Sequence, residues 1–123
     1  MARSPRWYAS TIATTKKAEM AQFDVFVNPI SRARRAYPYV AVLQSDLAEA
    51  GPERIVAPLV PRARLTGTVG RLTPHVRVSD VDHVLLVPSL AAIDAKDLRE
   101  LRGKLIAYRE MIVAAIDYLF LGV

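Results

Sequence analysis

Apolar residues in the first three quarters of the chain follow the spacing of short β-strands. Phe23, Val25 and Val27 alternate with their neighbours Gln22, Asp24 and Phe26, which is the two-residue period of a strand. An Asn-Pro pair ends this strand, and turn-forming residues separate four further apolar runs. The five expected strands cover residues 22–27, 39–43, 54–59, 75–78 and 83–87.

Two of these strands carry further expectations. Pro58 confines the third strand to a sheet edge or a strand end, because proline cannot donate a backbone hydrogen bond. Residues 79–82 (SDVD) are expected to form a hairpin loop between the last two strands. That hairpin would allow His75 and His83, which begin its two strands, to lie side by side.

The last quarter of the chain has the pattern of a helix. The helix is expected from about Leu98 to Phe120, with Asp94 or Asp97 capping its start and Gly103 as a weak point. Its expected inward face comprises Leu98, Leu101, Leu105, Ile112 and Ile116. The fold class is therefore mainly β: a small, largely antiparallel sheet or partial barrel of about five strands, followed by one C-terminal helix.

The final thirteen residues, 111–123, are apolar except for Asp117 and Gly122. A surface helix of a monomer normally shows one apolar stripe, whereas this segment is apolar on nearly every side. It is too short to cross a bilayer, which takes about 20 apolar residues. The segment is either a buried C-terminal helix or a helix whose outer face packs against a second copy of the chain. The carboxylate of Asp117 must be paired, protonated or at the surface.

Length and charge indicate one folded domain with a short extension. Residues 20–123 suffice for a single core, and residues 1–19 are expected to be a poorly ordered extension or an organelle-targeting segment. A secretory signal is excluded in 1–19 because no apolar stretch of seven occurs there. The extension carries +3 of the formal charge of +5, so the domain is only mildly basic. Direct nucleic-acid binding is therefore not expected.

No set of residues with the pattern of a catalytic or metal site stands out. The chain has no cysteine, the two histidines lack zinc-site spacing, and no phosphate-binding glycine loop occurs, so neither metal nor cofactor is expected. Ser45-Asp46 has no histidine near it in sequence, and Asp80 and Asp82 are typical of a hairpin loop. Three arginines at 32, 34 and 35 are expected in a solvated turn rather than a phosphate site. These observations favour a binding protein over an enzyme.

Residues 20–123 resemble the CcdB toxins of bacterial toxin–antitoxin modules. The matching segments are Gln22-Phe23-x-Val25 after Met20, Val42-Leu43-Gln44-Ser45-Asp46-Leu47, Arg54-x-Val56-x-Pro58-Leu59, Leu72-x-Pro74-x-Val76-x-Val78-x-Asp80, and Ala115-Ile116-x-x-x-Phe120-x-Gly122-Val123. The segments occur in the family's order and spacing. The resemblance implies an SH3-like barrel of the CcdB/MazF kind and a two-fold homodimer joined through the terminal helices.

The resemblance also implies a function. These cytoplasmic toxins bind the A subunit of DNA gyrase and trap it on cleaved DNA, and the disordered C-terminal segment of a cognate antitoxin neutralises them; neither enzymatic chemistry nor a membrane is involved. By position, the gyrase-binding residues would be Leu47, Ala48, Asp117, Phe120, Leu121, Gly122 and Val123. The dimer contacts would be Met111, Ala115, Ile116 and Leu119.

Two positions depart from the family pattern. Potent members end in Trp-Gly-Ile, where this chain has Leu121-Gly122-Val123, and they have Asn where it has Asp117. Leucine cannot stack on an arginine as tryptophan does. The change at Leu121 leaves open a non-toxic relic that still binds an antitoxin. Because MazF toxins share this barrel, the second alternative is an endoribonuclease using Arg32 or Arg35 with Thr66 or Thr68.

Overall fold

A computed structural model describes residues 20–46, 51–67 and 69–123 of the chain. Its strands are β2 (Asp24–Val27), β3 (Tyr39–Val42), β4 (Glu53–Pro61), β5 (His75–Val78), β6 (Val81–Leu85), β7 (Ala91–Asp94) and β8 (Leu101–Lys104), and helix α2 (Arg109–Leu121) follows them. All pairings among these strands are antiparallel. The sheet has the order β5-β6-β4-β3-β2-β8, with β7 added beside β4.

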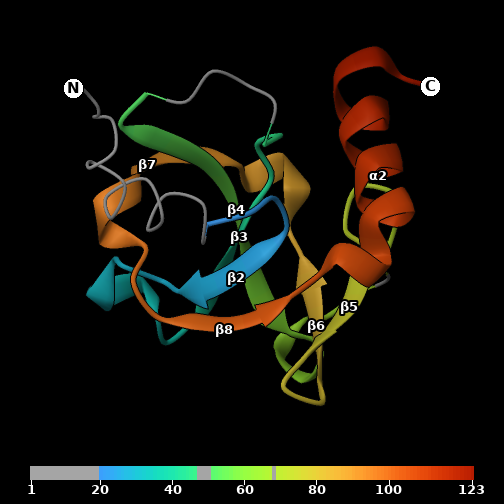
Figure 1. Ribbon diagram of the computed structural model, residues 1–123. Coiled ribbons are helices and arrows are strands. Elements are labelled where there is room, and N and C mark those ends of the chain that lie inside the picture. The colour runs from blue at the N-terminus through green and yellow to red at the C-terminus, as the bar shows by residue number, and fades with distance from the viewer. Residues whose placement is uncertain (1–19, 47–50, 68) are drawn as a thin grey trace.

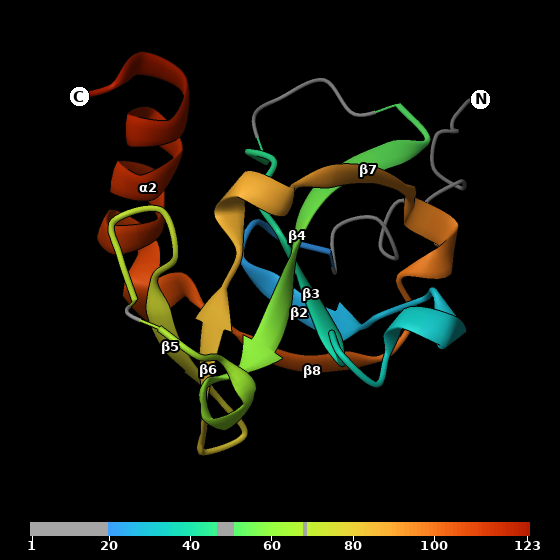
Figure 2. The same ribbon diagram turned by 180° about the vertical axis from the view of Figure 1, so that it is seen from behind.

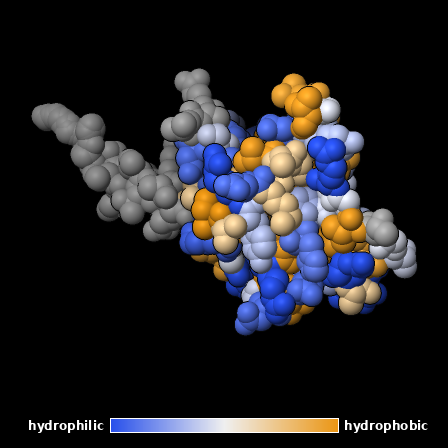
Figure 3. All heavy atoms as spheres, turned by 90° about the vertical axis from the view of Figure 1, so that its right-hand side faces the viewer, coloured by the Kyte–Doolittle hydropathy of each residue, from blue (hydrophilic) through white to orange (hydrophobic). Residues whose placement is uncertain are grey.

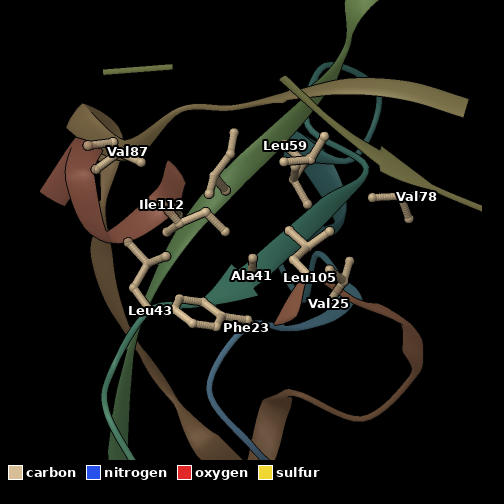
Figure 4. Close-up of a cluster of buried hydrophobic side chains, with 13 residues drawn as sticks. Phe23, Val25, Ala41, Leu43, Leu59, Val78, Val87, Leu105 and Ile112 are labelled. Atoms are coloured by element: carbon tan, nitrogen blue, oxygen red, sulfur yellow. The ribbon is translucent and has the colours of Figure 1, made fainter. Parts of the chain in front are cut away.

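The sheet curls into a half-barrel, and α2 stands along one side of it (Figures 1 and 2). The main core lies inside this curl, where side chains from β2, β3, β4, β5 and β6 meet the inner face of the helix. Figure 4 shows Ile112 of α2 among Leu43, Phe23 and Val87. The expected fold class, mainly β with one C-terminal helix, is therefore confirmed.

The five strands expected from the sequence are present, but the chain forms two more. Strands β7 and β8 occupy the region expected to lead into and begin the helix. The helix starts at Arg109 rather than near Leu98, so the expected boundary was wrong. The leucines at 98, 101 and 105 have helical spacing, yet Leu101 is 44% exposed on β8 while the other two are buried. Pairing with β2 decided this segment's conformation, since Gly103 lies opposite Val25.

The expected helix cap at Asp94 or Asp97 was also wrong. Asp94 ends β7 and precedes a single 3-10 turn, η4 (Ala95–Asp97), without a side-chain capping bond. Helix α2 begins instead after another 3-10 turn, η5 (Ile106–Tyr108). The backbone N–H of Leu105 donates to the carbonyl of Phe23 at 2.8 Å, so the sheet itself fixes where the helix starts.

Pro58 lies within the most central strand, not at an edge or end as expected. One side of β4 pairs with β3, and the other pairs first with β7 over 53–56 and then with β6 over 59–61. Pro58 falls in the interval between β7 and β6, where its carbonyl accepts a hydrogen bond from the N–H of Leu86 at 2.9 Å. The missing N–H of proline therefore faces a gap between two partner strands and leaves no ladder bond broken.

Strand β2 carries buried side chains on both of its faces. Val25 belongs to the main core, whereas Phe26 packs in a second cluster with Val40, Val42, Val56 and Leu98. Asp24 is buried as well, and its carboxylate accepts hydrogen bonds from the N–H of Ala21 at 2.9 Å and from Nζ of Lys104 at 3.0 Å. A curled sheet covered by other segments on its outside buries both sets of side chains.

The β5–β6 hairpin turns at Ser79 and Asp80 alone, both with positive φ, so the loop is shorter than expected. Asp82 belongs to β6 and pairs with Arg77 at 3.2 Å. His75 lies opposite Val84 and Val76 lies opposite His83. The two histidines therefore point to opposite faces, since neighbouring strand positions alternate. The expected side-by-side pair was wrong.

Candidate partner-binding site at the end of helix α2

Helix α2 is attached to the half-barrel by one narrow face. Ile112 and Ala115 are buried in the main core, and Val113, Ile116 and Leu119 are partly buried against it. Met111, Ala114, Phe120 and Leu121 of the helix are exposed. The core contacts of Ile112 and Ala115 therefore fix the position of the helix, and its outer surface can contact a partner.

The segment between β4 and β5 also holds the helix. The guanidinium of Arg71 lies 3.9 Å from the centre of the Tyr118 ring. Near the start of the helix, the hydroxyl of Tyr108 accepts a hydrogen bond from the N–H of Arg77 at 3.2 Å. These contacts fix both ends of α2 relative to the sheet.

Replacing Arg71 with alanine tests the contact at the far end of the helix. A cation over an exposed aromatic face contributes about 0.5–1 kcal/mol, so Arg71→Ala should lower the free energy of unfolding by that amount. Denaturant unfolding followed by circular dichroism measures the change. Arg71→Lys keeps a charge over the ring and should lose less. An equal loss in both variants would contradict the cation–π contact.

The end of α2 presents large apolar side chains to solvent. Phe120, Leu121 and Val123 are between 65% and 76% exposed, and Met111, in the first turn of the helix, is 48% exposed. In Figure 3 the uppermost hydrophobic group stands at the height where α2 ends in Figure 1. Such apolar exposure at one end of a helix is typical of a protein-binding surface.

The helix ends in a well-formed cap. Gly122 adopts the left-handed conformation, with φ of 74°, and its N–H donates to the carbonyl of Tyr118 at 3.0 Å. Glycine favours this conformation because it has no Cβ. Asp117 is exposed on the same final turns, so its carboxylate is at the surface, one of the three options left by the sequence.

The expected contact residues divide into four groups. Exposed are Met111, Asp117, Phe120, Leu121, Gly122 and Val123, whereas Ala115 is 1% exposed and faces its own core. Ile116 and Leu119 are partly buried against that core and keep only part of their surface for a partner. Leu47 and Ala48 lie outside the described residues.

Ile106 was not among the candidate contact residues expected from the sequence. Ile106 lies in η5 next to Met111, and both line an open hollow of about 580 Å³ at residues 106–111. The signal in the sequence was the pair Leu105-Ile106, of which one side chain is buried and the other exposed. A helix was expected from about residue 98, and in such a helix the turn at residues 106–108 that exposes Ile106 would not occur.

Several of the candidates for chemistry have structural partners. Oδ1 of Asp46 accepts a hydrogen bond from the N–H of Gln22 at 2.7 Å, and Asp82 is paired with Arg77. For the endoribonuclease alternative, Arg64, two positions before Thr66, donates to the carbonyl of Arg35, and Thr68 lies outside the described residues. Within the described ranges there is no cluster of three potential metal ligands, and no helix is long and apolar enough to cross a membrane.

Comparisons with known proteins add one finding. Residues 22–122 match the family model described as CcdB protein, which covers the half-barrel, α2 and Gly122. A search of the curated proteins found no match.

Proposed function

Because the chain belongs to the CcdB family, we propose that it is a toxin that binds the A subunit of DNA gyrase and traps the enzyme on cleaved DNA. The family match supports a toxin of a toxin–antitoxin module. The main observation that supports binding through the end of α2 is that its apolar side chains are exposed. The protein would act by binding alone, without catalysing a reaction, in the cytoplasm.

The tip of the helix supplies the proposed gyrase contact. Phe120, Leu121 and Val123 are consecutive or nearly so and remain largely exposed. Their burial in a groove of the target would provide apolar contact, and Asp117 at the same end would attract a basic group. Leu47 and Ala48 complete the proposed surface by family position only.

A homodimer would double this tip. Met111 and Ile106 are exposed beside each other, and Ile116 and Leu119 are partly buried. A second copy packed there would bury apolar surface that a monomer leaves in water. Ala115 supports the helix from inside and drops out of the proposed contact set. A disordered segment of the antitoxin would then cover the dimer and release gyrase.

Substitution of Leu121 tests the proposal in both directions. Leu121→Asp places a charge in the proposed contact and should weaken trapping of cleaved gyrase–DNA by about 30-fold or more. Leu121→Trp supplies a face that can stack on an arginine, a gain of about 0.5–2 kcal/mol, or roughly 2- to 30-fold. Purified gyrase, supercoiled plasmid and each variant, with linear DNA quantified after denaturation, give the measurement.

The matched control is Val81→Asp, the same kind of change at an exposed valine of the β5–β6 hairpin. It should trap cleaved DNA as well as the wild type. If neither the wild type nor Leu121→Trp traps cleaved DNA, the gyrase proposal fails and the relic alternative gains. Specific cleavage of RNA by the purified protein would instead support the endoribonuclease.

A further inference from the structure

Two arginine-containing turns meet at one end of the sheet. Turn η1 (Ser31–Ala33) precedes β3, and turn η2 (Arg62–Arg64) follows β4. Tyr39 of β3 lies opposite Leu59 of β4, so the chain before β3 and the chain after β4 leave the sheet at the same end. A hydrogen bond from the Arg64 guanidinium to the carbonyl of Arg35 joins them. The arginine cluster defined by this meeting comprises Arg32, Arg34, Arg35, Arg62 and Arg64.

The charges of the arginine cluster are not neutralised by carboxylates. Among the described residues, none of its five side chains forms an ion pair. Arg34 donates to the carbonyl of Asn28, and Arg62 donates to the carbonyls of Leu65 and Gly67 at 3.1 and 3.4 Å. Carbonyl partners orient a guanidinium without cancelling its charge. Arg32 and Arg35 make no side-chain hydrogen bond within the described part of the chain and are free to take a ligand.

The sequence around the arginine cluster is free of acidic residues. Residues 25–45 hold three arginines and residues 54–79 hold five, with no Asp or Glu in either range. Residues 80–123 hold seven acidic and five basic side chains. The net charge of residues 20–123 is therefore close to balance only because basic and acidic residues lie in different parts of the chain. The expectation of no nucleic-acid binding was based on that net charge, which does not show where the charges lie.

We propose that the arginine cluster binds the phosphate backbone of nucleic acid without reading base sequence. Guanidinium groups match phosphate oxygens in geometry and charge, and backbone contacts of this kind carry sequence-independent affinity. Turns η1 and η2 are single 3-10 turns, too short to enter a groove as a reading helix does. Among the residues that the structure describes, only Ile30 and Tyr37 add exposed large apolar side chains there, which is too little for the apolar centre of a protein interface.

The η1 side of this surface is separate from the proposed gyrase contact. In Figure 1 the cyan segment that contains η1 lies on the opposite side of the half-barrel from α2. Binding at the arginine cluster therefore does not depend on the gyrase proposal. A dimer joined through α2 would carry two such surfaces, one on each protomer.

The experiment compares Arg32→Gln/Arg35→Gln with a control of equal charge, Arg54→Gln/Arg109→Gln. Arg54 lies at the other end of β4, and Arg109 begins α2. Binding to fluorescein-labelled 20-base-pair DNA and to a 20-nucleotide single-stranded RNA is measured by anisotropy between 0.05 and 0.3 M NaCl. The wild type should bind both, with affinity that falls steeply with salt. The cluster variant should bind duplex on the order of 10- to 100-fold more weakly at 0.1 M NaCl, with a salt slope lower by about two.

Each outcome is decisive. Arg32→Lys/Arg35→Lys keeps the charge and should retain most of the affinity, which separates charge from folding. No binding of either nucleic acid at 100 µM protein and 0.05 M NaCl, or an equal loss in the control, overturns the proposal. Equal competition by polyglutamate at matched charge concentration would assign the surface to an acidic protein partner instead. A preference for RNA over duplex, or the reverse, identifies which phosphate backbone the surface takes.

Discussion

Replacement of Ile112 with alanine is expected to lower the free energy of unfolding by about 3 kcal/mol and the melting temperature by about 10–20 °C. Ile112 is fully buried between the sheet and α2, where it packs in the same cluster as Phe23, Leu43 and Val87 (Figure 4). Its removal leaves a cavity at the main attachment of the helix. Thermal and urea unfolding at low protein concentration measure the change.

The matched control is the neighbouring residue, Met111→Ala. Its side chain is half exposed, so the loss of stability in dilute protein should stay below about 1 kcal/mol. Similar losses in the two variants would mean that α2 is not attached through Ile112. Because the helix also carries the proposed tip, Ile112→Ala should weaken gyrase trapping even where the domain remains folded.

Met111→Glu is expected to convert a dimer into a monomer. In the proposed two-fold dimer the side chain of Met111 faces the second copy on both protomers. An unpaired carboxylate there costs about 3 kcal/mol on each protomer, about 6 kcal/mol in all, which raises the dissociation constant by roughly 10,000-fold or more. Sedimentation equilibrium at micromolar protein distinguishes a 13.6 kDa monomer from a species of twice that mass. Since Met111 is exposed in the single chain, the melting temperature extrapolated to low concentration should change little.

Val81→Glu is the control for this change, because it introduces the same charge at an exposed apolar residue of the β5–β6 hairpin. It should leave the dimer intact. A wild-type protein that is already monomeric at micromolar concentration would remove the basis for both the dimer and the doubled tip.

The largest disagreement between sequence and structure concerns residues 91–108. Leu98, Leu101 and Leu105 repeat at the spacing of a helix, and no local feature excludes one. The segment forms β7, β8 and two 3-10 turns because β4 and β2 offer it strand partners. Those pairings join residues about 40 and 80 positions apart, as between Arg54 and Ile93 and between Asp24 and Lys104. The spacing of apolar residues within a short segment cannot predict pairing with strands so far away in the sequence.

For the candidate site, too, the sequence predicted some features and only the structure showed the others. The apolar run with its single Asp117 predicted either a buried helix or a helix with an outward apolar face, and the exposure of Met111, Phe120 and Leu121 favours the second. The sequence did not show that Ala115 faces its own core, because a helix that is apolar nearly all round has no internal mark of which side is inside. The arginine cluster was missed for a related reason: Arg35 and Arg64 are adjacent only once β3 and β4 have paired.

By itself, the sequence determined that five strands, a terminal helix and the mainly β class are present, while the bounds of the strands shifted, most clearly for the fifth, which is Val81–Leu85 rather than 83–87. Each of these follows from alternation, turn residues or apolar runs that act over a few neighbouring positions. The tertiary structure decided where α2 begins, which of its faces is covered, how Pro58 fits a central strand and which charges gather at one end of the sheet. These four features depend on contacts between residues far apart in the chain. Such contacts stabilise the protein only once the whole sheet has formed.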